Sequence, residues 1–242
     1  MFSPRWLDFL YPPACALCRE PLRDGRYLCE SCRQDLPRIE KPFCIQCGEH
    51  IEGLVPDDVL CSQCRGSVFT FQFARAAADA RDQARELMHA YKYARQIHLH
   101  RELAMLAEEV WEDPRVAAQT DPPWILVPVP LHWRRQQWRW FNQSYEIART
   151  LARIRNLTFQ PALRRIRNTS QQTLLSRDER LANLRGAFRL RRREMRCRTL
   201  QNQPVLLVDD VFTTGSTAEE CARVLVEDGR AEKVVVVTVL RG

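Results

Sequence analysis

The segment VLLVDDVFTTGST (residues 205–217) runs from four apolar residues into two adjacent carboxylates and then into a cluster of hydroxyl side chains. The apolar run predicts a buried strand, and the next stretch, STAEECARVLVEDG, predicts a helix that begins with hydroxyl caps and ends at Gly229. Backbone amides at a helix start have no partner within the helix, and the helix dipole favours an anion there. The segment therefore predicts a strand, an anion-binding loop and a helix.

The rest of the chain after residue 68 alternates in the same way. Predicted strands cover residues 67–78, 124–130 and 233–240, and predicted amphipathic helices cover residues 81–96, 101–113 and 142–155. The run KVVVVTVL is typical of a strand that is covered on both faces. This alternation predicts an α/β fold with a parallel sheet and helices on both faces. Ligands of such sheets bind at the carboxyl ends of the strands, where Asp209 and Asp210 follow the strand.

The loop has the donors of a phosphate site. Thr213, Thr214, Ser216 and Thr217 supply hydroxyls, and Gly215 allows the backbone to approach a ligand closely. The sequence lacks the Gly-Lys-Ser/Thr of a Walker loop and the glycine pattern of dinucleotide sites. Asp209 and Asp210 are suited to accept hydrogen bonds from the hydroxyls of a sugar attached to the phosphate. The alternatives are a Mg²⁺-binding acidic pair and a simple capped turn.

Eight of the ten cysteines form four Cys-x-x-Cys pairs, a spacing that lets one turn of chain present two thiolates to one metal ion. Four such pairs within fifty residues favour zinc over disulfides or a redox site. The predicted ligands are Cys15, Cys18, Cys29, Cys32, Cys44, Cys47, Cys61 and Cys64.

We expect two structural zinc ions, because eight thiolates fill two tetrahedral sites and leave no open position for catalysis. Spacing alone is compatible with sequential pairing, as two tandem zinc ribbons, and with an interleaved cross-brace. The predicted organisation is a double zinc ribbon over residues 1–68 and an α/β domain over residues 69–242.

The chain has 242 residues and a net charge of +7, and only Lys41, Lys92 and Lys233 are lysines among its 37 basic residues. Arginine binds phosphates in bidentate geometry, which favours anionic ligands, although a compositional bias of the genome is the alternative explanation. We find no secretory leader and no run of membrane-spanning length, so a cytoplasmic protein is expected.

The segment VLLVDDVFTTGST resembles the phosphoribosyl pyrophosphate (PRPP) signature of type I phosphoribosyltransferases. The resemblance implies that Asp209 and Asp210 hold the ribose 2′- and 3′-hydroxyls and that residues 213–217 hold the 5′-phosphate. It also implies Mg²⁺, bound together with PRPP, and a type I phosphoribosyltransferase-like fold.

Two further segments, VPVPLHWRRQQWRWFNQSYEIA and RIRNTSQQTLLSRDERLANLRGAF, are similar to the ComF/GntX family, as are the cysteine pairs and the Tyr-Lys-Tyr at residues 91–93. Members of that family join a zinc ribbon to such a domain and are linked with competence and with the use of extracellular DNA. The sequence departs from the family pattern at Trp140, where glycine is usual.

The arginine-rich segments extend the expected site. Arg134, Arg135 and Arg139 follow a predicted strand end and are suited to bind a diphosphate. Residues 164–198 hold twelve arginines and predict either a mobile flap over the ligand or a solvated basic loop.

The expected function is binding of PRPP or another ribose 5-phosphate, with Mg²⁺-dependent phosphoribosyl transfer as the enzymatic hypothesis. The alternatives are a non-catalytic competence factor that binds single-stranded DNA and a regulator that senses PRPP. HWRRQQWRWFNQ interleaves aromatic and basic residues, as single-strand binders do.

Overall fold

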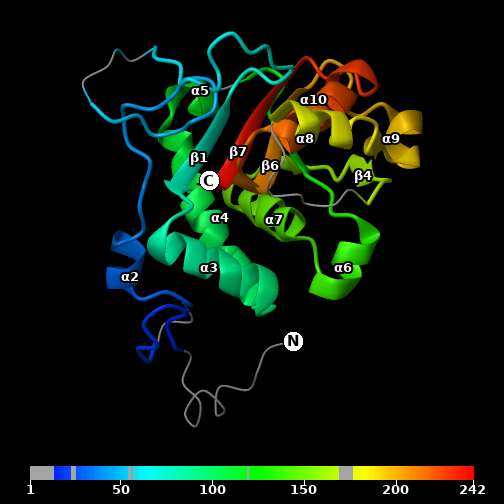
Figure 1. Cartoon of the computed structure of the whole chain (residues 1–242). Helices are drawn as coiled ribbons and strands as arrows, with labels where there is room; N and C mark the ends of the chain where they lie inside the picture. The colour runs from blue at the N-terminus through cyan, green and yellow to red at the C-terminus, as the bar shows by residue number, and fades with distance from the viewer. Residues whose placement is uncertain (1–13, 23–25, 54–55, 57, 119, 169–176) are drawn as a thin grey trace.

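A five-stranded parallel sheet forms the centre of the structure, a computed structural model that describes residues 14–22, 26–53, 56, 58–118, 120–168 and 177–242 (Figure 1). The strand order is β1-β7-β6-β2-β3, and each neighbouring pair runs parallel. The strands are β1 (Ala74–Asp79), β2 (Ile125–Pro128), β3 (Thr158–Phe159), β6 (Pro204–Phe212) and β7 (Lys233–Arg241). The predicted α/β fold class is confirmed.

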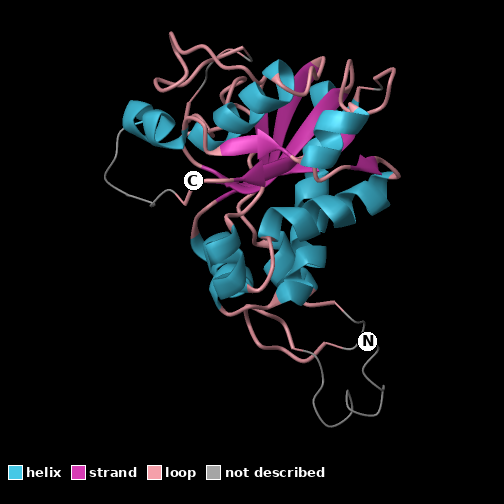
Figure 2. Ribbon diagram, turned by 90° about the vertical axis from the view of Figure 1, so that its right-hand side faces the viewer, coloured by secondary structure: helices cyan, strands magenta, loops and turns pink. Residues whose placement is uncertain are grey.

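Helices cover both faces of this sheet (Figure 2). One face packs against α3 (Asp82–Tyr93), α4 (His100–Glu108) and α7 (Gln143–Arg155), and the other packs against α10 (Ser216–Glu227). Along residues 205–208 of β6 and 234–237 of β7, successive side chains alternate between the two cores, so both strands are buried on both sides, as their apolar runs predict.

The first strand is shorter than predicted, because residues 67–73 lead up to the sheet without forming part of β1. The backbone N–H of Thr70 donates to the Glu219 carboxylate at 2.9 Å, and its hydroxyl donates to the same group at 2.5 Å. These hydrogen bonds tie Thr70 to the first turn of α10, and backbone pairing with β7 begins at Gln72, whose N–H donates to the Val234 carbonyl at 2.8 Å.

Residues 158–200 contain a second, two-stranded antiparallel sheet of β4 (Leu163–Arg165) and β5 (Phe188–Leu190). The helices α8 (Arg177–Leu184) and α9 (Arg192–Cys197) flank β5, and Gly186 N–H donates to Glu220 on α10 at 2.6 Å. The described parts of the arginine-rich segment are therefore ordered elements. Residues 169–176, with most of the NTSQQT motif, lie outside the described residues, and the flap stays a prediction.

The cysteine-rich segment packs along the outer edge of β1. Backbone hydrogen bonds join Ile39 to Ala77 at 3.0 Å, Asp79 to Pro37 at 2.9 Å and Ala74 to Gln46 at 2.8 Å. They cover an edge that would otherwise expose unpaired backbone groups. The boundary predicted at residue 68 thus separates segments that share hydrogen bonds and core contacts.

The remaining described elements are short. They are α2 (Glu30–Gln34), η1 (Ile97–Leu99), η2 (Glu109–Glu112), α5 (Pro114–Ala117) and α6 (Trp133–Arg139). No helix was predicted over residues 133–139, which were considered for their arginines and for the interleaving of aromatic and basic side chains. The structure shows a helix there, with His132 accepting a hydrogen bond from the Arg134 amide at its start.

Candidate functional site

A polar cavity of about 270 Å³ opens at the carboxyl ends of β2 and β6. The two carboxylates of the 205–217 segment lie in its wall, together with residues from α3, α7 and the β2–α6 connection. The lining residues that carry the argument are Lys92, Arg139, Ser144, Arg165, Asp209, Asp210, Thr213 and Thr217.

Asp209 is held from two sides. The Ser144 hydroxyl, at the start of α7, donates to Asp209 Oδ1 at 2.7 Å, and the Asp210 backbone N–H donates to the same oxygen at 2.9 Å. Burial and the neighbouring Asp210 carboxylate raise the pKa of Asp209 to about 7. The site thus holds a carboxyl group that changes charge close to neutral pH.

Asp210 pairs with Lys92, from the last turn of α3, with 2.9 Å between Nζ and Oδ1. Each side chain is 15% exposed, so the pair borders the cavity from a largely buried position. The Tyr-Lys-Tyr motif is part of the family resemblance, but sequence reasoning did not assign Lys92 to the site. The one signal in the sequence was the position of Lys92 in that motif, because no local pattern predicts that residue 92 meets residue 210 in the fold.

The loop after β6 has a left-handed backbone at Gly215, with φ of +77°. A Cβ at this position would lie 2.7 Å from Cζ of Phe212, so the phenyl ring directly beneath the loop leaves room only for glycine. Gly215 is also the N-cap of α10 and offers no side-chain cap, which leaves the first-turn amides without a side-chain partner from the cap residue. This is the geometry of an anion-binding helix start.

The hydroxyls of the loop are divided between two places. Thr213 and Thr217 line the polar cavity, whereas the Thr214 and Ser216 hydroxyls lie 3.0 Å apart and share a hydrogen bond within the loop. Ser216 is buried. Of the five predicted loop residues, two therefore face the cavity and three shape the loop beside it.

Of the three predicted arginines, Arg139 lines the cavity. Its Nη1 donates to Gln143 Oε1 at 3.1 Å, and its guanidinium lies 5.2 Å from the centre of the Tyr93 ring. Arg134 is exposed on α6, 5.3 Å from the Trp133 ring centre, and is not among the lining residues. The side chain of Arg135 lies outside the described residues. Sequence reasoning missed Arg165 of β4 as a lining residue, since it is one of many arginines in a segment expected to be a flap.

Trp140 ends α6 in the left-handed conformation, with φ of +71°. Glycine adopts this conformation without a steric penalty, whereas a residue with a Cβ adopts it at a cost. The Trp140 ring is 74% exposed and stacks beneath Arg95, whose guanidinium lies 4.5 Å from the ring centre. Trp133 and Trp138 are 55% and 56% exposed, so α6 and its C-cap carry three exposed aromatic side chains.

The eight predicted zinc ligands form two clusters of four. The first cluster consists of Cys15, Cys18, Cys29 and Cys32, and the second of Cys44, Cys47, Cys61 and Cys64. The pairing is sequential, which decides between the two arrangements that spacing allowed. Within each cluster, all four sulfurs lie within 4.8 Å of one another.

The cysteine geometry fits zinc. Zn–S bonds of about 2.3 Å in a tetrahedron place the sulfurs about 3.8 Å apart, and the Cys18–Cys29 and Cys47–Cys61 sulfur distances are 3.6 Å and 3.7 Å. A hydrogen bond from Cys47 lowers the pKa of the Cys44 thiol to about 4, whereas burial raises the pKa of Cys61 and Cys64. Zinc binding would displace the remaining thiol protons, because the ligand form of cysteine is the thiolate. The clusters fit two structural zinc ions.

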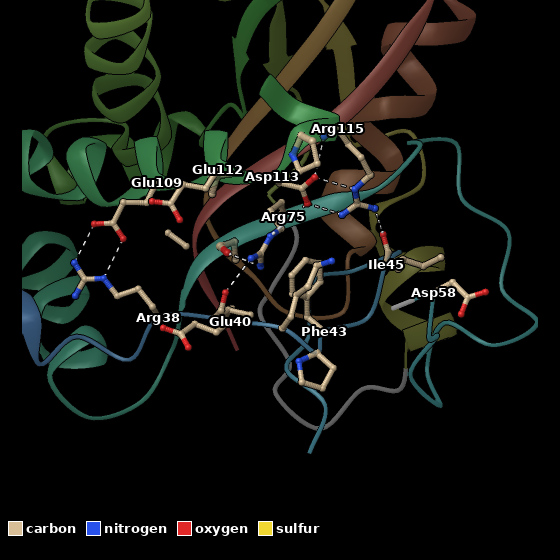
Figure 3. A pocket seen from close by; sticks show the side chains of 17 residues that line it. Arg38, Glu40, Phe43, Ile45, Asp58, Arg75, Glu109, Glu112, Asp113 and Arg115 are labelled. Atoms are coloured by element: carbon tan, nitrogen blue, oxygen red, sulfur yellow. Dashed lines mark hydrogen bonds and ion pairs between the residues drawn. The ribbon is translucent and has the colours of Figure 1, made fainter. Parts of the chain in front are cut away.

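A larger cavity of about 630 Å³ lies between the second cysteine cluster's segment and β1 (Figure 3). Its arginines are already committed to partners. Arg115 pairs with Asp113 at 2.7 Å, Arg38 pairs with Glu109 at 2.9 Å, and Arg75 donates to the Ile39 carbonyl at 2.9 Å (Figure 3). None of the described residues that are predicted to hold a ribose phosphate lines this cavity.

No helix within the described part of the chain is both long enough and apolar enough to cross a membrane. Residues 6–68 match the family model of the double zinc ribbon domain. This match agrees with the two cysteine clusters.

Three relatives are similar over almost the whole chain. DNA utilization protein YhgH of Escherichia coli (strain K12) is 34% identical, with 91% of this chain and 93% of that protein covered. Competence protein F of Haemophilus influenzae is 28% identical, with 87% and 90% covered. Competence protein ComFC of Bacillus subtilis is 26% identical, with 91% and 86% covered. With a cysteine-rich segment, a parallel sheet and this sequence similarity, the chain belongs to the family of the DNA utilization protein YhgH and the competence proteins F and ComFC.

Proposed function

We propose that the polar cavity binds PRPP or another ribose 5-phosphate, and that the protein uses this site in the utilization of DNA. The observation that carries the proposal is the meeting of two adjacent carboxylates with an open helix start in one cavity at the strand ends. A sugar phosphate offers both matching groups, hydroxyl donors and an anion, on one small molecule.

In this proposal the ribose hydroxyls donate to Asp209 and Asp210. The Ser144 hydroxyl and the Lys92 ammonium already keep these carboxylates in fixed positions, at 2.7 Å and 2.9 Å. The 5′-phosphate accepts from the amides and hydroxyls of residues 213–217. Burial of Asp209 favours a ligand that supplies hydrogen-bond donors, because an ionised carboxylate without donors is costly there.

The pyrophosphate of PRPP would lie toward Lys92, Arg139 and Arg165, which line the same cavity. These three cations, together with Mg²⁺ brought by PRPP, would offset its charge. The connection after β2, residues 129–131, borders the cavity; the Val129 amide is bonded to the Val208 carbonyl at 2.9 Å, which leaves the Leu131 amide as the donor that this connection would offer.

If the protein is an enzyme, its reaction is phosphoribosyl transfer: a nitrogen nucleophile displaces pyrophosphate from ribose C1. The charge of the leaving pyrophosphate would be neutralised by the three cations, and the acceptor would supply the electron pair for the new C–N bond. No described residue of the cavity specifies an acceptor base. A sensor that binds PRPP without turnover is therefore the alternative within the same site.

A second function, binding of single-stranded DNA, is favoured by the exposed aromatic and basic side chains of α6 and its C-cap. Three tryptophans more than half exposed, with Arg134 and Arg95 against two of the rings, supply stacking surfaces and charge together. The printed names of the relatives, DNA utilization protein and competence protein, agree with this role.

Titration calorimetry separates these functions. Wild-type protein is titrated with PRPP and Mg²⁺, with ribose 5-phosphate, and with a short oligonucleotide, and pyrophosphate release is assayed with a panel of nitrogen bases. Binding of PRPP with release supports the transferase, and binding without release supports the sensor. A wild-type protein that binds neither sugar phosphate contradicts the proposed pocket, whatever its affinity for DNA.

A further inference from the structure

The second cysteine cluster and the loop of residues 213–217, called the phosphate loop below, are joined by one buried side chain, Arg241 of β7. The guanidinium is only 6% exposed. Its Nη2 donates to Cys47 Sγ at 3.8 Å and to Glu49 Oε2 at 3.3 Å, while its Nη1 donates to the Phe212 carbonyl at 3.3 Å and also to the Gly242 carbonyl. One arginine thus contacts a metal ligand and the residue immediately before the loop.

Phe212 lies between Arg241 and the loop and contacts both. Its ring lies 5.4 Å from the Arg241 guanidinium and directly beneath Gly215, where an added Cβ would come within 2.7 Å of it. The Gly242 backbone N–H also donates to the Phe212 carbonyl, at 2.8 Å. One small pocket is lined by residues of the second cluster, of the loop and of β7 together: Cys47, Cys64, Thr213, Thr214 and Arg241.

The second cluster is also fixed to the sheet. Gln46, between two of its ligands, accepts a hydrogen bond from the Ala74 backbone N–H at 2.8 Å. Arg115 reaches from α5 to the Ile45 carbonyl at 2.8 Å (Figure 3). Gly48 lies so close to β1 that a Cβ would be 3.1 Å from the Ala74 carbonyl oxygen. Loss of the metal from this cluster would therefore disturb the edge of the sheet as well as the cysteine-rich segment.

The first cluster has different neighbours. Cys15, Cys29 and Cys32 belong to the hydrophobic core that includes α4, on the other face of the sheet. The nearby anchor is the ion pair between Arg33 and Glu102, at 2.7 Å. Among the described contacts of its four cysteines, none reaches residues 212–217. Both clusters have four cysteine ligands, but the second lies against β1 and the phosphate loop, whereas the first lies against the core that includes α4.

Zinc bound by four thiolates carries a net charge of −2, and a buried guanidinium next to such a site both offsets that charge and donates N–H···S hydrogen bonds to it. We propose that Arg241 is a positioning residue through which zinc in the second cysteine cluster holds the phosphate loop in its binding conformation. The proposal rests on the proposed function, in that residues 213–217 bind the phosphate of a ribose 5-phosphate. With zinc bound, Cys47 is a fixed thiolate acceptor for Arg241. Without zinc, the four cysteines are no longer held together, and Arg241 is no longer held where it donates to the Phe212 carbonyl.

The central variant is Arg241→Met, which keeps an unbranched apolar stem in place of the arginine methylenes and removes the guanidinium with its charge and donors. The matched control is Arg65→Met, which removes an exposed arginine next to Cys64. Three quantities are measured on the zinc-loaded full chain: affinity for ribose 5-phosphate by calorimetry, release of zinc to a chromogenic chelator, and hydrogen–deuterium exchange of the amides of residues 212–217.

We expect Arg241→Met to weaken ribose 5-phosphate binding about tenfold, to speed release of one of the two zinc ions, and to increase exchange in the loop. Arg65→Met should change none of the three. Because coupling between two binding sites is reciprocal, saturating ribose 5-phosphate should slow the release of one zinc ion from the wild type and leave the other unchanged. Should Arg241→Met not fold, Arg241→Lys, which keeps the charge with fewer donors, should show the same changes to a smaller extent.

Two results separate failure of this proposal from failure of the proposed function. If wild type binds ribose 5-phosphate, and Arg241→Met speeds zinc release with unchanged affinity and loop exchange, the coupling is wrong while the pocket stands. If wild type does not bind ribose 5-phosphate, the pocket assignment falls, and loop exchange alone then decides the coupling: no increase in Arg241→Met overturns it.

Discussion

Ser144 and Asp209 are 65 positions apart in the sequence and are joined by a 2.7 Å hydrogen bond from hydroxyl to carboxylate. The contact fixes the start of α7 against the end of β6, so the two elements that flank the cavity cannot separate without freeing a partly buried carboxylate. It also places a hydroxyl donor on Asp209, which is the type of group that the proposed sugar would present.

Replacing both aspartates, Asp209→Asn with Asp210→Asn, should reduce affinity for PRPP with Mg²⁺ by more than about tenfold. Hydrogen bonds to a charged group contribute about 1.5–3 kcal/mol each, and about 1.4 kcal/mol is a factor of ten. Calorimetry on wild type and the double variant measures the change. DNA affinity should not fall, because the variant carries less negative charge than the wild type. Undiminished PRPP binding would mean that the loop is only a capped turn.

Asp209 should make stability depend on pH in the opposite sense to an ordinary salt-bridged aspartate. Its pKa of about 7 in the folded chain lies above the ordinary aspartate value of 3.8, so between these values the folded state binds more protons and the free energy of unfolding falls as pH rises. Asp209→Asn removes this loss. Its stability relative to wild type should rise by about 2–3 kcal/mol between about pH 5 and pH 8.

Chemical denaturation without ligand, at several pH values, measures this difference. Asp228→Asn, at an exposed position on the C-terminal side of α10, is the control and should show no such trend. A constant difference between Asp209→Asn and wild type across the range would show that the carboxyl does not change protonation on folding.

Elemental analysis of protein purified without chelator should find two zinc ions per chain. Cys15→Ser and Cys44→Ser should each lose one, because the clusters do not share ligands. We further expect Cys44→Ser to disturb the phosphate loop more than Cys15→Ser, as measured by hydrogen exchange over residues 212–217. Loss of both ions in either variant would indicate that the sites fill cooperatively.

Trp140→Gly should separate folding from DNA binding on α6. Glycine suits the left-handed backbone at this position, so the free energy of unfolding should change by no more than about 1 kcal/mol. The exposed ring is lost, and base–aromatic stacking contributes about 1–3 kcal/mol per base. Affinity for single-stranded DNA should therefore fall about fivefold or more in a fluorescence titration. Equal affinity would exclude the Trp140 ring from the interface.

Changing Arg134 and Arg135 to alanine addresses the electrostatic part of the same surface. Removal of one arginine–phosphate ion pair should flatten the dependence of log affinity on log salt by about 0.7 for a single strand. Titrations at several salt concentrations give the slope. An unchanged slope would place both arginines outside the DNA interface.

The parallel sheet and the cysteine clusters were predictable because their signals are local. A continuous apolar run such as residues 233–240 is typical of a strand that is buried on both faces, and repeated Cys-x-x-Cys pairs are typical of metal sites. The two carboxylates and the loop could also be located, because a strand end followed by a helix start fixes their place in an α/β fold.

The rest depends on contacts between distant parts of the chain. Lys92 and Arg165 carry no local mark that sends them to the cavity, and Arg241 meets Cys47 across 194 positions. The arginines of α6 were predicted as a group, but helical periodicity turns successive side chains about 100° apart, so Arg134 and Arg139 cannot be assumed to face one ligand. Spacing along the chain indicates the chemistry of these residues but not the direction in which they point.

The place of β1 in the sheet has a consequence for synthesis. Its only strand partner among the described residues is β7, far along the chain, while its outer edge is covered by residues 37–46 that precede it. The ligands of both metal sites lie within residues 15–64, which precede β1 in the chain and therefore emerge from the ribosome before it. A metal-loaded cysteine segment can therefore shield one side of β1 during translation, so that the nascent strand waits for β7 with a single open edge.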